Sequence, residues 1–304
     1  MEDFFYRFDS PIVIQASGED AEDYLQSQWT IDLRKLKIGY VRYGLRLSAK
    51  GKILAGAYIA RIKEEDFLLI TFTTTAIEII KLMEENVVAD EVEFQDVSEE
   101  WKIFGLHLKN SGILASKFDL TAIEDEKIIK FEDGMFMADK KMPSAFYLAL
   151  CPKGTDWEKQ FKDGLKEITK QQHEFLRIKL SNYFVSAEVG LDDLPQEAGM
   201  EKNFVDFNKG CYLGQEVMAR LHSMGKVQTK ILTVLWKSDK DFQPTLPSDI
   251  IMDQKIVGQL RTLVNNGNSW LGVAKVHLKA KERLEEEGLD LEDKSMGKIF
   301  GYER

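Results

Sequence analysis

The sequence predicts an α+β fold, and three observations carry this prediction. Compact β-prone apolar runs alternate with helical patterns up to residue 180, and strand patterns dominate beyond Lys226. A hydrophobic fraction of 44% in 304 residues is enough to bury a sizeable core. At roughly 100 to 200 residues per domain, this length predicts two or three domains. Disordered and fibrous classes are therefore excluded.

The first helical pattern lies in residues 17–29. Ser17 is the expected N-cap, and Asp20 stands three residues later, where an acid completes a capping box. The positions at helical spacing behind them are Ala21, Tyr24, Leu25 and Gln28. Their spacing predicts a short helix.

A β-hairpin and a second helix are expected next. Residues 53–62 and 67–72 are compact β-prone runs, and the charged residues 63–66 between them are typical of a hairpin turn. Thr74 or Thr75 is expected to cap the following helix. Its expected buried stripe recurs at steps of three or four residues and comprises Ile77, Ile80, Met83 and Val87.

The middle of the chain predicts a second α+β unit. Short strand patterns occupy residues 101–108, 127–131 and 144–150, and Cys151 after the last of them is an expected core residue. An amphipathic helix is marked by Trp157, Phe161, Leu165 and Ile168. A further helical stretch covers residues 173–180.

The C-terminal part predicts a β-domain. Strand patterns recur at residues 229–237, 255–264 and 269–276. The charged run at residues 281–293 is interpreted as a solvated face or turn with no function of its own.

Composition and charge argue against several function classes. With 41 basic and 51 acidic residues, the net charge is −10 and the pI is near 5.1, which disfavours direct nucleic-acid binding through a broad basic face. No apolar run reaches the roughly 18 residues of a membrane helix, and the N-terminal residues are acidic where a signal peptide is basic. We therefore expect a cytoplasmic protein with no membrane partner. A bacterial cytosol is favoured over a mitochondrial matrix because no Arg- and Ser-rich transit segment is present.

The cysteines and histidines show no metal-ligand spacing. Cys151 and Cys211 stand far apart, without a Cys-x-x-Cys pair or a disulfide framework. The histidines are His107, His173, His222 and His277. Their separation predicts no intrinsic metal site and is compatible with a reducing compartment.

The chemical signal is concentrated in residues 205–231, where a β-prone lead-in, a glycine-containing loop and a helix start coincide. Unpaired amides at a helix start favour an anion, and Gly210 and Gly214 permit close backbone approach. Cys211 would feel the same field. Together with Lys209 and Arg220, that field would stabilise a thiolate suited to nucleophilic, redox or metal-binding chemistry.

Two readings of this stretch stay open. Gln215 and Glu216 add hydrogen-bonding groups suited to recognising a polar heterocycle. Alternatively, Cys211 is a small core residue and the Gly-Gln-Glu run only caps a helix, which is the commoner outcome for an isolated motif.

The stretch is not isolated, because three further patches accompany it. Residues 209–216 read Lys-Gly-Cys-Tyr-x-Gly-Gln-Glu and closely resemble the signature of the YgfZ/GcvT-like family, as do Ala219, Arg220 and Gly225 after them. Residues 47–55 resemble the family's hairpin, with Ala49 where proline is common. The N-terminal pattern is matched by Gly18, Asp20, Ala21, Tyr24, Leu25, Gln26, Gln28, Thr30 and Asp32. The element before the signature is matched by Leu194, Pro195 and Glu197.

The resemblance implies a GcvT-like ring of three domains, two of them α+β and ferredoxin-like and the last a small β-barrel. The predicted division is an N-terminal domain of residues 1–98 completed by residues 169–225, a second domain of residues 99–168, and a barrel of residues 226–304. No motif matches the centre of the chain.

The resemblance also implies a function. The family binds tetrahydrofolate or a derivative, acts in iron–sulfur cluster assembly or repair, and supports tRNA modification through cluster enzymes. The implied partners are iron–sulfur cluster proteins or their assembly factors. Cys211 is the implied chemical centre, as a redox group or transient iron–sulfur contact. The implied folate-binding or loop residues are Lys209, Gly210, Tyr212, Gly214, Gln215, Glu216, Arg220, Glu197 and Arg177.

Two of these residues have a second interpretation. Arg177 either contacts the glutamate tail of folate or is an exposed or snorkelling side chain on its helix. Glu197 is either a folate contact or a carboxylate that stabilises its loop.

Departures from the related glycine cleavage aminomethyltransferase leave the enzymatic activity open. Where that enzyme resembles G-G-I-x-D-D, this chain has Ala55 and Gly56 in place of the acidic pair. Aminomethyl transfer by the standard route is therefore disfavoured. The alternatives are a folate-dependent aminomethyltransferase or other one-carbon transferase, and a folate-independent protein scaffold.

Overall fold

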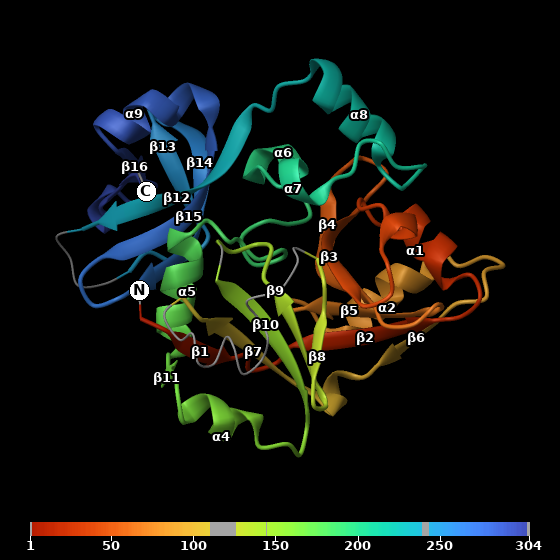
Figure 1. The fold of residues 1–304 in the computed structure, drawn as a ribbon. Coiled ribbons are helices and arrows are strands. Elements are labelled where there is room, and N and C mark those ends of the chain that lie inside the picture. The colour runs from red at the N-terminus through yellow and green to blue at the C-terminus, as the bar shows by residue number, and fades with distance from the viewer. Residues whose placement is uncertain (1, 110–125, 144, 239–242, 303–304) are drawn as a thin grey trace. The chain divides into compact units, whose positions relative to one another are not determined.

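A computed structural model describes residues 2–109, 126–143, 145–238 and 243–302 (Figure 1). The chain forms two compact units, and each is described by itself. The first comprises Met1–Thr169 and Phe204–Gln215, and the second Lys170–Asn203 and Glu216–Arg304. Mixed sheets, helices and a closed barrel confirm the predicted α+β class. Among the described residues, no helix has the length and apolar character needed to cross a membrane.

The first sheet of the first unit has five strands in the order β3-β4-β5-β2-β6, all antiparallel. The strands are β2 (Ile12–Ser17), β3 (Tyr40–Leu47), β4 (Ile53–Arg61), β5 (Asp66–Thr71) and β6 (Glu93–Asp96). The helices are α1 (Ala21–Gln28), η1 (Leu33–Lys35) and α2 (Ala76–Glu84). Both the first helix and the β4–β5 hairpin agree with the sequence prediction. Trp29, Leu25 and Ile79 pack the helical side onto one face of this sheet.

The ends of α1 and the face of α2 differ from the prediction in detail. Asp20, and not Ser17, occupies the N-cap of α1, and its carboxylate accepts a hydrogen bond from the amide of Glu91 at 2.8 Å. Thr75 caps α2 in a capping box, as expected. However, Ile77 is 80% exposed, and Ile79 with Met83 forms the buried face. Since Ile77 precedes Met83 by six positions, it points about 120° away around the helix.

The second sheet of the first unit has six strands in the order β11-β1-β7-β10-β9-β8. The strands are β1 (Phe4–Arg7), β7 (Trp101–His107), β8 (Ile129–Phe131), β9 (Gly134–Ala138), β10 (Phe146–Pro152) and β11 (Lys166–Glu167), with η2 (Ser98–Glu100) and α4 (Trp157–Lys162) beside them. Although β1 begins the chain, it pairs with β7 and β11. Cys151 is buried beside Trp157, as expected, and burial raises the pKa of its thiol. That thiol is therefore inert at neutral pH.

The second unit contains a closed six-stranded barrel in the order β12-β15-β14-β13-β16-β17, as predicted for the C-terminal part (Figure 1). Its strands are β12 (Thr229–Lys237), β13 (Ser248–Met252), β14 (Lys255–Asn265), β15 (Trp270–His277), β16 (Leu289–Leu291) and β17 (Lys298–Gly301). The remaining helices are α5 (Lys170–Lys179), α6 (Pro195–Ala198), α7 (Glu201–Phe204), α8 (Gln215–Met224), η4 (Leu278–Ala280), α9 (Lys281–Glu286) and η5 (Lys294–Met296).

The interpretation of the charged run at residues 281–293 as a solvated face or turn is wrong. It contains α9 with Leu284 buried, followed by barrel strand β16 with Leu289 and Leu291 buried. The alternation Leu-Asp-Leu supplies an inward-facing pair of side chains despite the surrounding charge.

The predicted boundaries of three domains and their arrangement as a ring stay predictions.

Candidate functional site

The motif segment, residues Phe204–Gln215, brings together three sequence patches within the first unit. The amide of Asp206 donates to the carbonyl oxygen of Thr30 at 2.8 Å, and the amide of Leu213 donates to that of Ser27 at 3.1 Å. Both acceptors lie in the N-terminal patch around α1. The turn after β3 is the third patch, because Gly214 lies against the carbonyl of Ser48. These contacts are the structural basis for treating the three patches as one site.

Gly214 is required by the conformation of this contact. Its φ is +85°, and a Cβ placed on it would lie 2.6 Å from the Ser48 oxygen. Both the backbone conformation and the lack of space therefore favour glycine. Gly210, by contrast, has no atom within 4 Å of a built Cβ. The two glycines of the signature consequently do different things.

Lys209 fastens the motif segment to the end of α1. Its Nζ atom donates to the carbonyl oxygens of Gln26 at 2.7 Å, Trp29 at 2.5 Å and Ile31 at 2.7 Å. An ammonium group has three protons, so these carbonyls use all of them. The acceptors lie at and beyond the C-terminal end of α1, where unpaired carbonyls and the helix dipole favour a cation.

Lys209 is buried and has an unusually low pKa. Its side chain is 6% exposed. Burial lowers the pKa of Lys209 to about 8, and the nearby carboxylates of Asp32 and Asp206 oppose that shift. The three protons of the Lys209 ammonium are directed at carbonyl oxygens, and its effect on the Cys211 thiolate stays a prediction.

Tyr212 is a second buried anchor of the motif segment. Its ring lies 5.2 Å from the Lys209 ammonium, a cation–π distance. Its hydroxyl is buried and has no hydrogen-bond partner among the residues that the structure describes. Burial raises the pKa of Tyr212 to about 12, so the phenol is neutral at physiological pH.

Cys211 lies between these anchors and is exposed. The motif segment thus buries Lys209 and Tyr212 and exposes the Cys211 thiol to solvent. This corrects the alternative reading of Cys211 as a core residue.

The remaining signature residues lie on α8, which begins at Gln215. The Gln215 amide donates to the Tyr212 carbonyl at 3.1 Å, which joins the loop to the helix start. Glu216 and Arg220 are exposed and belong to the second unit.

Arg177 is a buried residue of the second unit, in contrast to the expected exposed or snorkelling side chain. It is 2% exposed, and its guanidinium donates to both carboxylate oxygens of Glu188 at 2.8 Å. It also pairs with Glu174 and donates to the Asn182 carbonyl at 3.2 Å. All of these partners of Arg177 belong to the second unit.

Glu197 is also committed within the second unit. One carboxylate oxygen accepts from the amide of Leu194 at 2.7 Å and forms the capping box of α6. The other accepts from Thr229 and lies 3.0 Å from the Lys275 ammonium. Of the two interpretations of Glu197, these contacts favour the carboxylate that stabilises its loop.

Sequence reasoning missed a carboxylate that lies beside β4. Tyr58 shares a face of this strand with Gly56, since side chains alternate along a strand, and its hydroxyl donates to Asp139. The Tyr43 ring packs edge-on against Tyr58 at 4.9 Å and against Phe204 at 4.8 Å. Asp139 is separated from Tyr58 by 81 positions, and no local sequence pattern marks the contact.

Within the described part of the chain, no group of three or more His, Cys, Asp or Glu side chains is placed to hold a metal ion.

Comparison with known proteins gives both sequence and structural matches. Residues 12–131 match the family model of the GCVT N-terminal domain. An uncharacterized protein of Haemophilus influenzae is 24% identical over 268 residues, which cover 86% of this chain and 85% of that protein. A protein of Colwellia psychrerythraea named tRNA-modifying protein YgfZ is 24% identical over 247 residues, covering 80% of this chain and 74% of the relative.

An aminomethyltransferase of Thermoanaerobacter pseudethanolicus is 24% identical over 229 residues, covering 70% of this chain. The match spans 61% of that relative, which is less than two thirds of its length. The crystal structure of the glycine cleavage system aminomethyltransferase T from Bartonella henselae has a TM-score of 0.80 at 13% identity and covers 98% of this chain and 84% of that one. This likeness confirms the predicted fold class.

Proposed function

The chain belongs to the YgfZ/GcvT-like family, and from this premise we propose that it is a tetrahydrofolate-binding accessory protein of iron–sulfur cluster assembly or repair. In this proposal it supports tRNA modification indirectly, through cluster enzymes. The observation that carries the proposal is the placement of Cys211 on the motif segment. Two buried neighbours, Lys209 and Tyr212, hold that segment, and the thiol between them is exposed.

The polar groups beside the motif segment fit a pterin-containing ligand. Buried polar atoms without partners in the described residues include the Tyr212 hydroxyl, the Trp29 indole nitrogen and a side-chain oxygen of Gln28. A pterin ring carries both N–H donors and oxygen and nitrogen acceptors, so it can pair with such a set. We expect these groups to hold the ring together with Gln215, while Arg177 and Glu197 have structural roles.

Cys211 is proposed to act after folate binds. An exposed thiol can reach a cluster carried by a partner without any rearrangement of the buried anchors. The cluster is cargo in this proposal, and the partners are iron–sulfur proteins or their assembly factors. Neither a membrane nor a nucleic acid is required, and the cytoplasmic location stays a prediction.

Calorimetric titration tests folate binding directly. Wild-type protein and Cys211→Ala protein would each be titrated with tetrahydrofolate and its 5-formyl derivative. We expect saturable binding by both proteins. An absence of binding by folded wild-type protein would contradict the folate proposal and favour the folate-independent scaffold.

Complementation tests the role of the thiol. Cys211→Ala is expected to fail to restore cluster-enzyme activity in a cell that lacks its own family member, although it binds folate. The matched control is Cys151→Ala at the inert, buried cysteine, provided that the protein accumulates normally. Full rescue by Cys211→Ala would exclude the proposed chemistry at this residue.

The pair of Asp139 and Tyr58 favours one alternative, a folate-dependent aminomethyltransferase or other one-carbon transferase. Ala55 and Gly56 provide no carboxylate on β4, but Asp139 places one beside the same strand. This alternative predicts substrate-dependent formation of methylene-tetrahydrofolate that Asp139→Asn abolishes. Wild-type protein that forms no such product would exclude it.

A further inference from the structure

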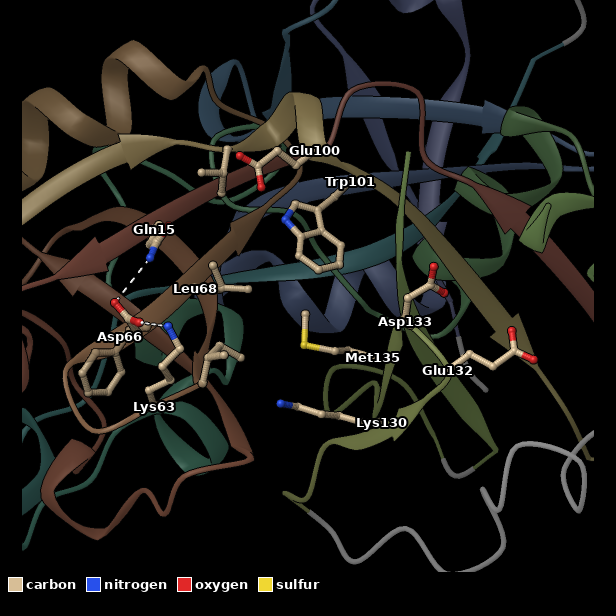
Figure 2. A pocket seen from close by; sticks show the side chains of 14 residues that line it. Gln15, Lys63, Asp66, Leu68, Glu100, Trp101, Lys130, Glu132, Asp133 and Met135 are labelled. Carbon is tan, nitrogen blue, oxygen red and sulfur yellow. Dashed lines mark hydrogen bonds and ion pairs between the residues drawn. The ribbon is translucent and has the colours of Figure 1, made fainter. Parts of the chain in front are cut away.

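A pocket of 320 Å³ lies between the two sheets of the first unit, and none of its residues belongs to the motif segment or to the patches that contact it. It is bordered by β2 and β5 on one side and by β7, β8 and β9 on the other (Figure 2). Backbone pairing joins the two sheets, since the amide of Ile128 donates to the Gly39 carbonyl at 2.7 Å. The volume is at the lower end of the range for small-molecule sites, so the occupant must be small.

Apolar side chains line the middle of this pocket. Leu68 on β5 and Met135 on β9 are buried, and they come from opposite sheets. In the view of Figure 2, Met135 lies between the indole ring of Trp101 and the side chain of Lys130. An apolar body placed between the sheets can therefore contact Leu68, Met135 and the face or edge of the indole.

Lys130 supplies the charged group that points into the pocket. Its side chain leaves β8, and its ammonium is directed into the space between the sheets (Figure 2). This ammonium has no ion-pair partner within the described part of the chain. It carries three N–H donors and no acceptor, so its complement is an acceptor with negative charge.

The nearest ion pair in the lining is already balanced. The carboxylate of Asp66 accepts from the Lys63 ammonium at 2.8 Å and from the side-chain amide of Gln15 at 3.3 Å. The hydrogen bond from Lys63 lowers the pKa of Asp66, so both members of the pair are charged at neutral pH. Their charges sum to zero, and the charge of Lys130 is additional to them.

The other carboxylates around the pocket are not directed at Lys130. Glu132 and Asp133 lie in the turn between β8 and β9, and both point away from the space (Figure 2). Asp133 instead accepts from the indole nitrogen of Trp157 at 3.1 Å. Glu100 lies at the opposite end of the pocket from Lys130 (Figure 2). The Lys130 end therefore favours an anionic group, and the Glu100 end disfavours one.

We propose that this pocket binds a small monocarboxylic acid with an apolar body. The carboxylate accepts hydrogen bonds from the Lys130 ammonium, and the body lies between Leu68 and Met135 with its far end at the Trp101 ring. A single carboxylate is specified because Glu100 would repel a second one at the other end. The site is independent of the folate proposal, because it shares no residue with the motif segment.

Two probes of similar shape and opposite charge test the site. Full-length protein would be titrated calorimetrically with 3-phenylpropionate and with phenethylammonium, up to about 10 mM. We expect saturable binding of the carboxylate and none of the ammonium. Equal binding of both probes, or no binding of 3-phenylpropionate, would overturn the proposal.

Variants of one lysine place the probe in this pocket. Lys130→Met removes the charge at similar length and is expected to weaken 3-phenylpropionate binding by about fivefold. Lys130→Arg keeps the charge and should lose less. The matched control is Lys127→Met, at an exposed lysine three positions earlier and outside the pocket, which should bind like wild type. Equal weakening by Lys127→Met and Lys130→Met would contradict a site at Lys130.

Tetrahydrofolate provides the test of independence, because it also carries carboxylates on an aromatic body. Lys130→Met is expected to leave the affinity for tetrahydrofolate unchanged while it weakens 3-phenylpropionate binding. A loss of tetrahydrofolate binding by folded Lys130→Met protein would assign Lys130 to the folate site, and the proposal of a separate site would then be wrong.

A direct readout avoids dependence on any variant that unfolds. In wild-type protein with ¹³C-methyl methionine, 3-phenylpropionate should shift the Met135 signal, which a Met135→Leu spectrum assigns. An unchanged Met135 signal at saturating probe would show that the carboxylate binds elsewhere and would refute the proposal.

Discussion

The ammonium of Lys209 lies 2.5 Å from the main-chain oxygen of Trp29, a residue 180 positions earlier in the chain. The same ammonium donates to Gln26 and Ile31, so a single side chain joins the motif segment to the end of α1. The lysine of the signature thus holds the loop that presents Cys211.

Replacing Lys209 by Met should destabilise the first unit by about 2–4 kcal/mol, because it leaves three carbonyl oxygens without their donor. Urea denaturation followed by tryptophan fluorescence measures the change in the free energy of unfolding. Lys50→Met, at an exposed lysine near the β3–β4 turn, is the control and should stay within about 0.5 kcal/mol of wild type. Equal effects of the two changes would contradict the proposed fastening.

The two signature glycines should differ in the unfolding free energy that they lose on replacement by alanine. Gly214→Ala places a Cβ against the Ser48 oxygen at a φ of +85°, and should cost about 1–3 kcal/mol of unfolding free energy. Gly210→Ala meets open space and should change the unfolding free energy by less than about 0.5 kcal/mol. Thermal and urea unfolding of both proteins check this order, and a larger loss for Gly210→Ala would refute it.

Tyr212 should make stability fall at high pH. Its folded-state pKa is raised to about 12 from 10.0, so the native state holds a proton that the unfolded state loses between these values. The contribution is therefore complete below pH 10 and is lost as pH rises toward 12. Tyr212→Phe should show a shallower decline over this range and no loss at pH 7, since the hydroxyl has no partner in the described residues. An unaltered decline would mean that Tyr212 does not contribute.

Two buried arginines should differ in their tolerance of methionine. Arg46 is 1% exposed, and its one hydrogen bond within the described chain goes to the Leu47 carbonyl at 2.7 Å, without a carboxylate. Burial lowers the pKa of Arg46. Arg46→Met should therefore leave the unfolding free energy unchanged or raise it by about 1 kcal/mol.

Arg177→Met strands the buried carboxylate of Glu188 and should cost about 3–5 kcal/mol. Chemical denaturation of each variant beside the wild type decides the matter. A similar loss for both arginines would show that Arg46 has a stabilising partner of its own.

Local signals predicted most of the elements. The helix cap, expected at Thr74 or Thr75 and found at Thr75, and the charged turn between β4 and β5 act over a few residues, so the sequence displays them. The predicted buried face of α2 was wrong because Met83 belongs to both possible apolar stripes. Only packing against the sheet selects Ile79 over Ile77. Strand β16 was missed because charged neighbours outweighed a short alternation.

Contacts between distant segments set the rest of the candidate site. The resemblance pointed to the residues of the signature, but it did not indicate that Lys209 reaches the carbonyl of Trp29. Asp139 and Tyr58 meet across sheets, and neither carries a local pattern that identifies the other. Such pairings depend on the tertiary arrangement, which periodicity and spacing do not encode.

The order in which the chain is synthesised separates β1 from its partners. Strand β1 is synthesised before its partners, because β7 begins at Trp101 and β11 at Lys166, so its sheet stays incomplete until both have been made. The first sheet can form early. However, the carbonyls at the end of α1 have no Lys209 ammonium to donate to them until the motif segment has been synthesised. A nascent chain halted before Phe204 therefore has a first unit that lacks the motif segment and its contacts with α1. The first unit is most exposed to misassembly at this stage.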